Sequence, residues 1–424
     1  MRARRTSSPH LFLRQSDPPP PPPQPTVPST QIIRRDLYSY VGLIAIVAAV
    51  PAIDWAGLGG ADAVNAARLA YFTVVAIGSV YLGVKRQDIG ETSPISGNSA
   101  ALAPIFASVT LGGLYLCLKY TGLNPGSLYQ FFACLFALLA TADLLRPLLG
   151  LGLANELLAP ASQDFGEKRE AEIMNLGALP AFAVSLALIV AYAQGPETTG
   201  GALTTPAFAA LNDCLGWSIT MAALGVLALE SFTAAAALLL GLFLYDAFFV
   251  FKSDVMLTVA TQIEAPAKFL FARLRGEGDG SYPFSVLGLG DVVVPGAFVS
   301  LLREVDKDGL EPVEGSRPRA PPIDAAKAAE APSTYFRAGL GAYTVGLAGT
   351  FAANYLTKSG QPALVYIVPS LLITALATAA ARGELEGLLA YRSSRAAQAV
   401  EARRQWKERR AAEKEQELRG VGRK

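Results

Sequence analysis

The stretch FSVLGLGDVVVPGAFVSLL, residues 284–302, is almost wholly apolar and has the length of a membrane span, yet Asp291 lies near its middle. A charged side chain at bilayer depth costs about 3 kcal/mol on insertion scales, so such a residue usually faces the protein interior and has a function. Gly288 and Gly290 precede this acid, and Pro295 follows it. Because glycine permits unusual backbone angles and proline removes a hydrogen-bond donor, we expect a spanning helix that is frayed around Asp291.

The composition of the whole chain indicates a polytopic membrane protein. Of its 424 residues, 52% are hydrophobic and 17% are charged, which is too apolar for a soluble protein of this size. The net charge of +1 gives no reason to expect nucleic-acid binding. The only histidine, His10, lies in a polar N-terminal arm, and the three cysteines lie inside apolar stretches, so the sequence predicts no metal site and no cofactor. Catalysis within the membrane would therefore use carboxylates as acid and base.

Ten apolar segments each approach the roughly 20 residues that a helix needs to cross a bilayer. They are residues 37–56, 67–84, 99–120, 125–147, 173–194, 205–226, 231–251, 284–303, 334–357 and 361–381. The first segment is interrupted by Pro51 and Asp54, so it either crosses the membrane or lies in the interface. The pattern predicts an all-α polytopic membrane protein.

The distribution of lysine and arginine predicts the orientation of these segments. If the N-terminus is cytosolic, most basic residues fall on the cytosolic side, and the opposite loops at 57–66 and 195–204 carry none. This asymmetry favours an even number of spans with both termini cytosolic. The connection 252–283 is a mild conflict because it carries lysines and arginines on the opposite side. A connection partly folded onto the membrane surface would tolerate them.

A second acid, Asp246, follows Tyr245 in the span directly before residues 284–303. Two acids on consecutive spans can face each other, and carboxyls held close together do not both ionise readily, so one retains a proton near neutral pH. One carboxyl then acts as general base on a water molecule, while the other donates a proton to the carbonyl under attack. The alternative is a pair of buried acids that only bond neighbouring helices.

Two further polar or helix-breaking features lie in the spans. Pro362, Ala363 and Leu364 stand near the start of the last span, where unpaired backbone would accept an extended substrate by strand addition. A proline in the first turn of an ordinary helix is the alternative interpretation. Asp213, beside Asn212 within 205–226, is either a hydrogen-bonding group behind the site or a contact of a solvated cavity.

Three short motifs occur in order on three late spans: Tyr245-Asp246, Gly288-Leu289-Gly290-Asp291 and Pro362-Ala363-Leu364. Together they resemble the signature of the presenilin-type intramembrane aspartyl proteases. The sequence around them is similar to the signal peptide peptidase branch rather than to presenilin. The likeness runs from about residue 67 to 381 and is strongest after residue 231.

The resemblance implies that Asp246 and Asp291 are the catalytic aspartates, that Tyr245 and Gly288 to Gly290 belong to the active-site motif, and that Pro362 to Leu364 position the substrate. It also implies a nine-span core in the endoplasmic reticulum membrane, to which residues 37–56 add one N-terminal crossing. Substrates would be transmembrane peptides in the lipid bilayer, namely signal-peptide remnants and type II membrane segments. Homo-oligomers and association with degradation machinery of the endoplasmic reticulum stay open.

The expected organisation follows from these segments. It comprises a Pro-rich, disordered arm (1–36), the added segment (37–56), the first part of the core (67–251), a lumenal loop (252–283), the second part of the core (284–381) with a flexible cytosolic loop (304–333), and a charged cytosolic tail (382–424).

Two functions other than proteolysis would use the same buried acids and membrane segments. A proton-coupled secondary transporter would use the buried acids as proton carriers, although no internal repeat is evident. An adaptor would bind membrane segments without cleaving them.

Overall fold

The fold is that of a helical membrane protein, seen in a computed structural model. The structure describes residues 42, 45–46, 61–86, 93–95, 102–105, 108–110, 113, 126–157, 167–196, 200–251, 265–272, 284–310, 333–357, 361–394, 396–397, 401 and 404. The predictions for the arm at 1–36, for most of 37–56 and 99–120, and for most of the loops at 252–283 and 304–333 lie outside these residues.

Six described helices are long and apolar enough to cross a membrane. They are α2 (Ala61–Arg86), α4 (Gly126–Leu157), α5 (Glu167–Ala193), α6 (Thr205–Val226), α7 (Phe232–Phe251) and α12 (Ala363–Arg382). Two further helices, α9 (Gly290–Asp308) and α11 (Thr334–Thr357), stand among them. The predicted all-α polytopic class is confirmed, because each of these helices overlaps a predicted apolar segment. Helix α4 continues past the predicted end at residue 147 to Leu157, and α9 begins later than predicted.

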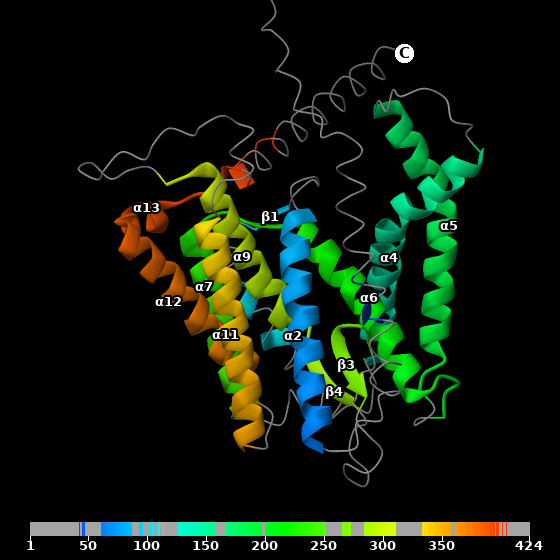
Figure 1. Ribbon diagram of the computed structural model, residues 1–424, viewed down its shortest axis with the longest axis horizontal. Coiled ribbons are helices and arrows are strands. Elements are labelled where there is room, and N and C mark those ends of the chain that lie inside the picture. Colours follow the sequence, from blue (N-terminus) through cyan, green and yellow to red (C-terminus); the bar gives the residue numbers. More distant parts are fainter. Residues whose placement is uncertain are drawn as a thin grey trace, which may run out of the picture.

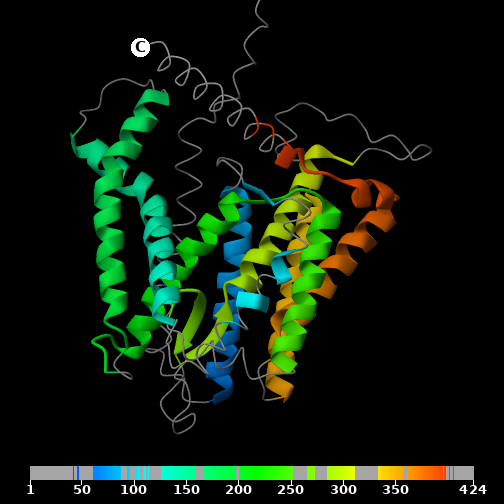
Figure 2. The ribbon, with the colours of Figure 1, turned by 180° about the vertical axis from the view of Figure 1, so that it is seen from behind.

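The helices form two groups joined through α6 (Figure 1). On one side, α4 packs along α5 and also contacts α6. On the other side, α11 lies against α12 and α9, and α12 lies against α7, while α2 stands between the two groups and contacts α6, α9 and α11. The reverse view in Figure 2 shows the same separation, with α4 and α5 apart from the larger bundle. The main hydrophobic core lies in this larger bundle.

The predicted spanning helix at 284–303 is wrong at its start, because its first residues form a strand. β4 (Phe284–Gly288) pairs antiparallel with β3 (Lys268–Ala272), with Lys268 opposite Gly288, and helix α9 begins only at Gly290. Phenylalanine and valine favour strands, and glycine disfavours the helix, so this segment pairs with a neighbour instead. A second pair joins β1 (Ser93–Ile95) in parallel to β2 (Leu227–Leu229).

Close approach of α11 and α12 depends on a glycine. A Cβ atom at Gly346 would lie 2.6 Å from the Cα atom of Ile367, nearer than real side chains come to backbone. Small residues at such crossings let two helix backbones approach in a membrane, where packing rather than the hydrophobic effect drives association. This contact holds α12, whose first turn carries the Pro-Ala-Leu motif, against α11.

The start of the predicted charged tail is folded onto the bundle rather than exposed. Helix α13 (Leu385–Ala390) buries Leu388, and Tyr391 and Ser393 are also buried. The backbone carbonyl of Tyr391 accepts a hydrogen bond from the amide of Phe232 (3.2 Å), and the amide of Ser393 donates to the carbonyl of Glu230 (2.9 Å). Residues 391–393 therefore close over the start of α7.

The same segment also bonds the end of α9. The hydroxyl of Tyr391 donates to Asp308 (2.8 Å), and the hydroxyl of Ser393 donates to Glu304 (2.5 Å). Burial and the hydrogen bond to Asp308 raise the pKa of the Tyr391 phenol, so it remains a donor. Helix α9 continues to Asp308, so the predicted cytosolic loop overlaps the last turn of this helix.

Candidate active site

Asp246 lies within α7 and is almost fully buried, with 2% of its surface exposed. Its Oδ2 atom accepts a hydrogen bond from the backbone amide of Leu364 (3.1 Å). Pro362 is the N-cap of α12 in an extended conformation, so the helix starts at Ala363 and leaves its first amides without an intrahelical acceptor. The Pro-Ala-Leu motif thus presents a free amide and the positive end of the helix dipole to a carboxyl group.

Asp291 lies in the first turn of α9, directly after the β3–β4 hairpin. The amide of Leu289 donates to the carbonyl of Ala267 (3.2 Å), which continues the hairpin pairing up to the helix start. The carbonyl of Leu289 accepts the amides of Val292 (3.1 Å) and Val293 (2.8 Å), which closes the first turn. The hairpin therefore determines where the helix that carries Asp291 begins.

The structure brings the two predicted acids together. Asp246 and Asp291 lie near enough for their charges to interact, and both charges also act on the phenol of Tyr245. Asp291 is only partly buried, whereas Asp246 is enclosed. Helices α7 and α9 thus supply two carboxyls and one phenol, and α12 holds the carboxyl of Asp246 through the Leu364 amide.

The glycines of the motif leave room beside Asp291. A Cβ atom at Gly288 would lie 3.4 Å from Oδ2 of Asp291, at van der Waals contact with the carboxyl. Gly290 is exposed, and within the described part of the chain a Cβ atom there would meet nothing within 4 Å. Space is therefore available next to Asp291 on the Gly290 side.

A buried network behind the site ties α6 to the hairpin. Asp213, which is fully buried, accepts hydrogen bonds from the Tyr71 hydroxyl (2.5 Å), the Leu270 amide (2.7 Å) and the Asn212 side chain (3.1 Å). The side-chain amide of Asn212 also donates to the carbonyl of Lys268 (2.7 Å). Asp213 is thus a hydrogen-bonding group and does not face a solvated cavity.

This network is connected to Asp291 through the backbone. Asp213 and Asn212 bond β3, β3 pairs with β4, and β4 leads into the first turn of α9. The sequence singled out Asp213 but not its partner Tyr71. Nor did it identify Tyr343 of α11, whose hydroxyl donates to the backbone carbonyl of Asp291 (3.2 Å).

Among the described residues, no three histidine, cysteine or acidic side chains are grouped to hold a metal ion.

The chain is similar to known proteins over most of its length. A family model described as signal peptide peptidase matches residues 86–395. The chain is 31% identical to human signal peptide peptidase over 325 residues, covering 74% of this chain and 77% of that protein. It is 29% identical over 323 residues to a Schizosaccharomyces pombe protein described as a probable intramembrane protease, covering 75% of this chain and 92% of that protein. Intramembrane protease 2 of Caenorhabditis elegans is 38% identical over 186 residues, covering 43% of this chain and 38% of that protein.

Proposed function

Because the chain belongs to the signal peptide peptidase family of intramembrane aspartic endopeptidases, we propose that Asp246 and Asp291 are its catalytic pair. Two observations carry the proposal: these acids, from α7 and α9, lie near enough for their charges to interact, and Asp246 accepts the Leu364 amide at the start of α12. The family matches do not favour the transporter alternative.

The proposed reaction is hydrolysis of a peptide bond by a water molecule held between the two acids. The ionised carboxyl takes a proton from the water as its oxygen bonds to the peptide carbon, and the protonated carboxyl gives its proton to the carbonyl oxygen. The tetrahedral intermediate then collapses, the C–N bond breaks, and the leaving nitrogen takes the proton that the base removed from water. The carboxyl that donated recovers its proton from the intermediate hydroxyl, so the pair returns to one shared proton.

The motif residues have separate roles in this proposal. The Leu364 amide fixes the carboxyl of Asp246, and Pro362 and Ala363 set the start of the helix that supplies this amide. Gly290 leaves the open space in which a substrate backbone would lie next to Asp291. Because Pro362, Ala363 and Leu364 lie beside Asp246 and orient its carboxyl, we assign substrate positioning to these three residues.

The substrates we propose are signal-peptide remnants and type II membrane segments. A helical substrate hides its carbonyls in intrahelical hydrogen bonds, and lipid offers no replacement donors. The peptide must unwind locally before the two acids reach a carbonyl. Helix-breaking residues near the scissile bond should therefore speed cleavage.

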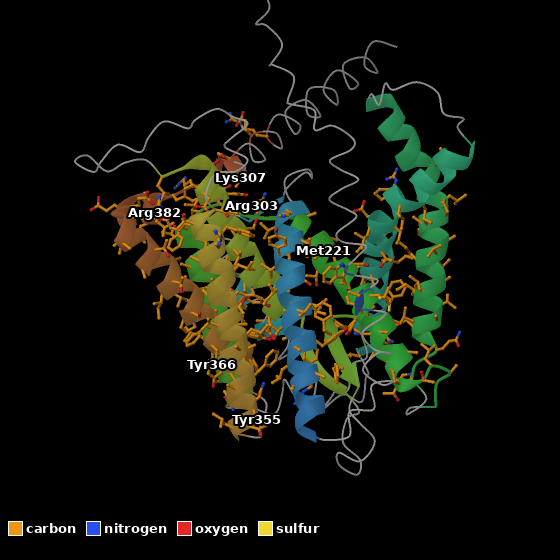
Figure 3. All side chains as sticks on the ribbon, in the orientation of Figure 1. Met221, Arg303, Lys307, Tyr355, Tyr366 and Arg382 are labelled. Atoms are coloured by element: carbon orange, nitrogen blue, oxygen red, sulfur yellow. The ribbon has the colours of Figure 1, made fainter. Side chains whose placement is uncertain are left out.

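The proposed location is the endoplasmic reticulum membrane, with both termini cytosolic. Figure 3 shows Arg303, Lys307 and Arg382 at one end of the larger bundle and Tyr355 and Tyr366 toward the other. Clustering of cations at one end supports a cytosolic position for that end, by the positive-inside rule. Helix α13 lies at the same end (Figure 1).

The test of the proposed function uses purified full-length protein in detergent and a synthetic signal peptide. We expect cleavage that a transition-state analogue of aspartic proteases blocks. Proton flux in liposomes without any cleavage would instead indicate a transporter. Peptide binding without cleavage would indicate an adaptor.

The pH dependence of cleavage is expected to be bell-shaped. Below the lower macroscopic pKa of the pair both carboxyls are protonated and no base remains, and above the higher one both are ionised and no acid remains. The initial rate on the synthetic peptide, measured between about pH 4 and pH 9, should therefore pass through a maximum. A flat profile over this range would contradict the shared-proton scheme.

A further inference from the structure

We propose that Tyr343 is a positioning residue for Asp291, because its hydroxyl supplies the hydrogen bond that Pro295 removes from the start of α9. The inference rests on the proposed function of Asp291 and concerns how this acid is held. It connects a residue of α11 with the helix-breaking proline that follows the acid.

The backbone of α9 is incomplete at Asp291. In an α-helix the carbonyl of residue i accepts the amide of residue i+4, and the residue four positions after Asp291 is Pro295. Proline has no amide hydrogen, and its ring also crowds the carbonyl four residues before it. The regular donor for the Asp291 carbonyl is therefore missing at a point where the helix is enclosed by apolar neighbours, Val292 among them.

Tyr343 stands where this donor is needed. Its hydroxyl lies 3.2 Å from the Asp291 carbonyl oxygen, within the range of a hydrogen bond, and its side chain is fully buried. Helix α11, which carries it, packs against α9. A buried hydroxyl and a helix carbonyl without its regular donor each cost free energy if left unpaired, so the pairing holds both groups in place.

The bond determines the orientation of the acid. Two backbone carbonyls hold the first turn of α9. The Leu289 carbonyl accepts two amides of the turn itself, and the Asp291 carbonyl accepts the Tyr343 hydroxyl of α11. Without the hydroxyl, the Asp291 carbonyl would turn toward the partly exposed side of the site to find water. That rotation would carry the carboxyl away from its position opposite Asp246.

The test compares Tyr343→Phe with the unaltered protein, using cleavage of the synthetic signal peptide. We expect kcat to fall roughly three- to tenfold with KM little changed, since one neutral hydrogen bond is worth about that factor and does not touch the substrate. The matched control is Tyr335→Phe, which removes the hydroxyl of another buried tyrosine of α11. That hydroxyl bonds Glu384 beyond the end of α12, whereas Asp246 is bonded at the start of this helix. This control should retain the full rate.

A double-mutant cycle makes the test specific for the proposed bond. Pro295→Ala restores a backbone amide that can donate to the Asp291 carbonyl, so adding Tyr343→Phe in this background should lower kcat less than twofold. An equal loss in both backgrounds would mean that Tyr343 acts through packing and would overturn the inference. A Tyr343→Phe protein with an unchanged kcat would also overturn it. Absence of cleavage by the unaltered protein would instead refute the proposed function.

Discussion

Replacing Asp291 by alanine is expected to reduce cleavage of the synthetic signal peptide by at least about a thousandfold. General acid–base catalysis contributes about 10²–10⁴-fold per group, and the pair fails as a unit when one member is lost. Asp246 remains hydrogen-bonded to the Leu364 amide, but no second carboxyl is left to act as its acid or base partner. The measurement is the single-turnover rate in detergent with enzyme in excess.

The matched control for this variant is Asp143→Ala. Asp143 is an exposed acid on α4, in the helix pair that stands apart from the site, so its loss should leave the rate unchanged. Asp246→Asn should be as inactive as Asp291→Ala. Cleavage that persists in either variant at the catalytic pair would exclude that residue from the mechanism.

Replacing Asp213 by alanine is expected to lower the stability of the protein as well as its activity. The change removes the acceptor for the Tyr71 hydroxyl, the Leu270 amide and the Asn212 side chain, all inside the protein. A buried donor left without a partner costs about 1–3 kcal/mol, so the free energy of unfolding should fall by about 3 kcal/mol or more. Thermal unfolding in detergent measures this loss as a lower midpoint temperature.

A graded control separates this network from a general packing effect. Tyr71→Phe removes one donor and leaves the carboxyl of Asp213 bonded to Leu270 and Asn212, so its loss of stability should be clearly smaller. In both variants peptide cleavage should fall, since the hairpin before Asp291 loses its support. An Asp213→Ala protein with the unfolding midpoint of the unaltered chain would contradict the structural role of this acid.

The spans were predictable from sequence where hydropathy alone determines them. Residues 205–226 and 334–357 match α6 and α11 because a long apolar run has no alternative to the helix in lipid. The prediction failed at residues 284–288, where the preceding segment Lys268–Ala272 supplies a strand partner. Long-range pairing leaves no periodic signal in either segment.

The acids of the candidate site were predictable, and the groups that hold them were not. Asp246 and Asp291 stand out because charge is rare inside apolar segments. Tyr71 and Tyr343 do not, because the chain has 15 tyrosines and tyrosine is common in membrane helices. The one signal for Tyr343 was indirect. Pro295, four residues after Asp291, has no amide hydrogen, which indicates that the Asp291 carbonyl needs a donor from outside the helix.

The segment at residues 391–393 gives the two acid-bearing helices a common pivot. It bonds the chain at the beginning of α7 and the last turns of α9, whereas Asp246 and Asp291 lie toward the opposite ends of these helices. Asp246 is fourteen positions after Phe232 along the helix, a distance of about 20 Å. A small tilt of α7 or α9 at its bonded end therefore gives a larger displacement of the acid near the other end. Loss of the hydrogen bonds of residues 391–393 would free the ends of both helices in one cooperative step.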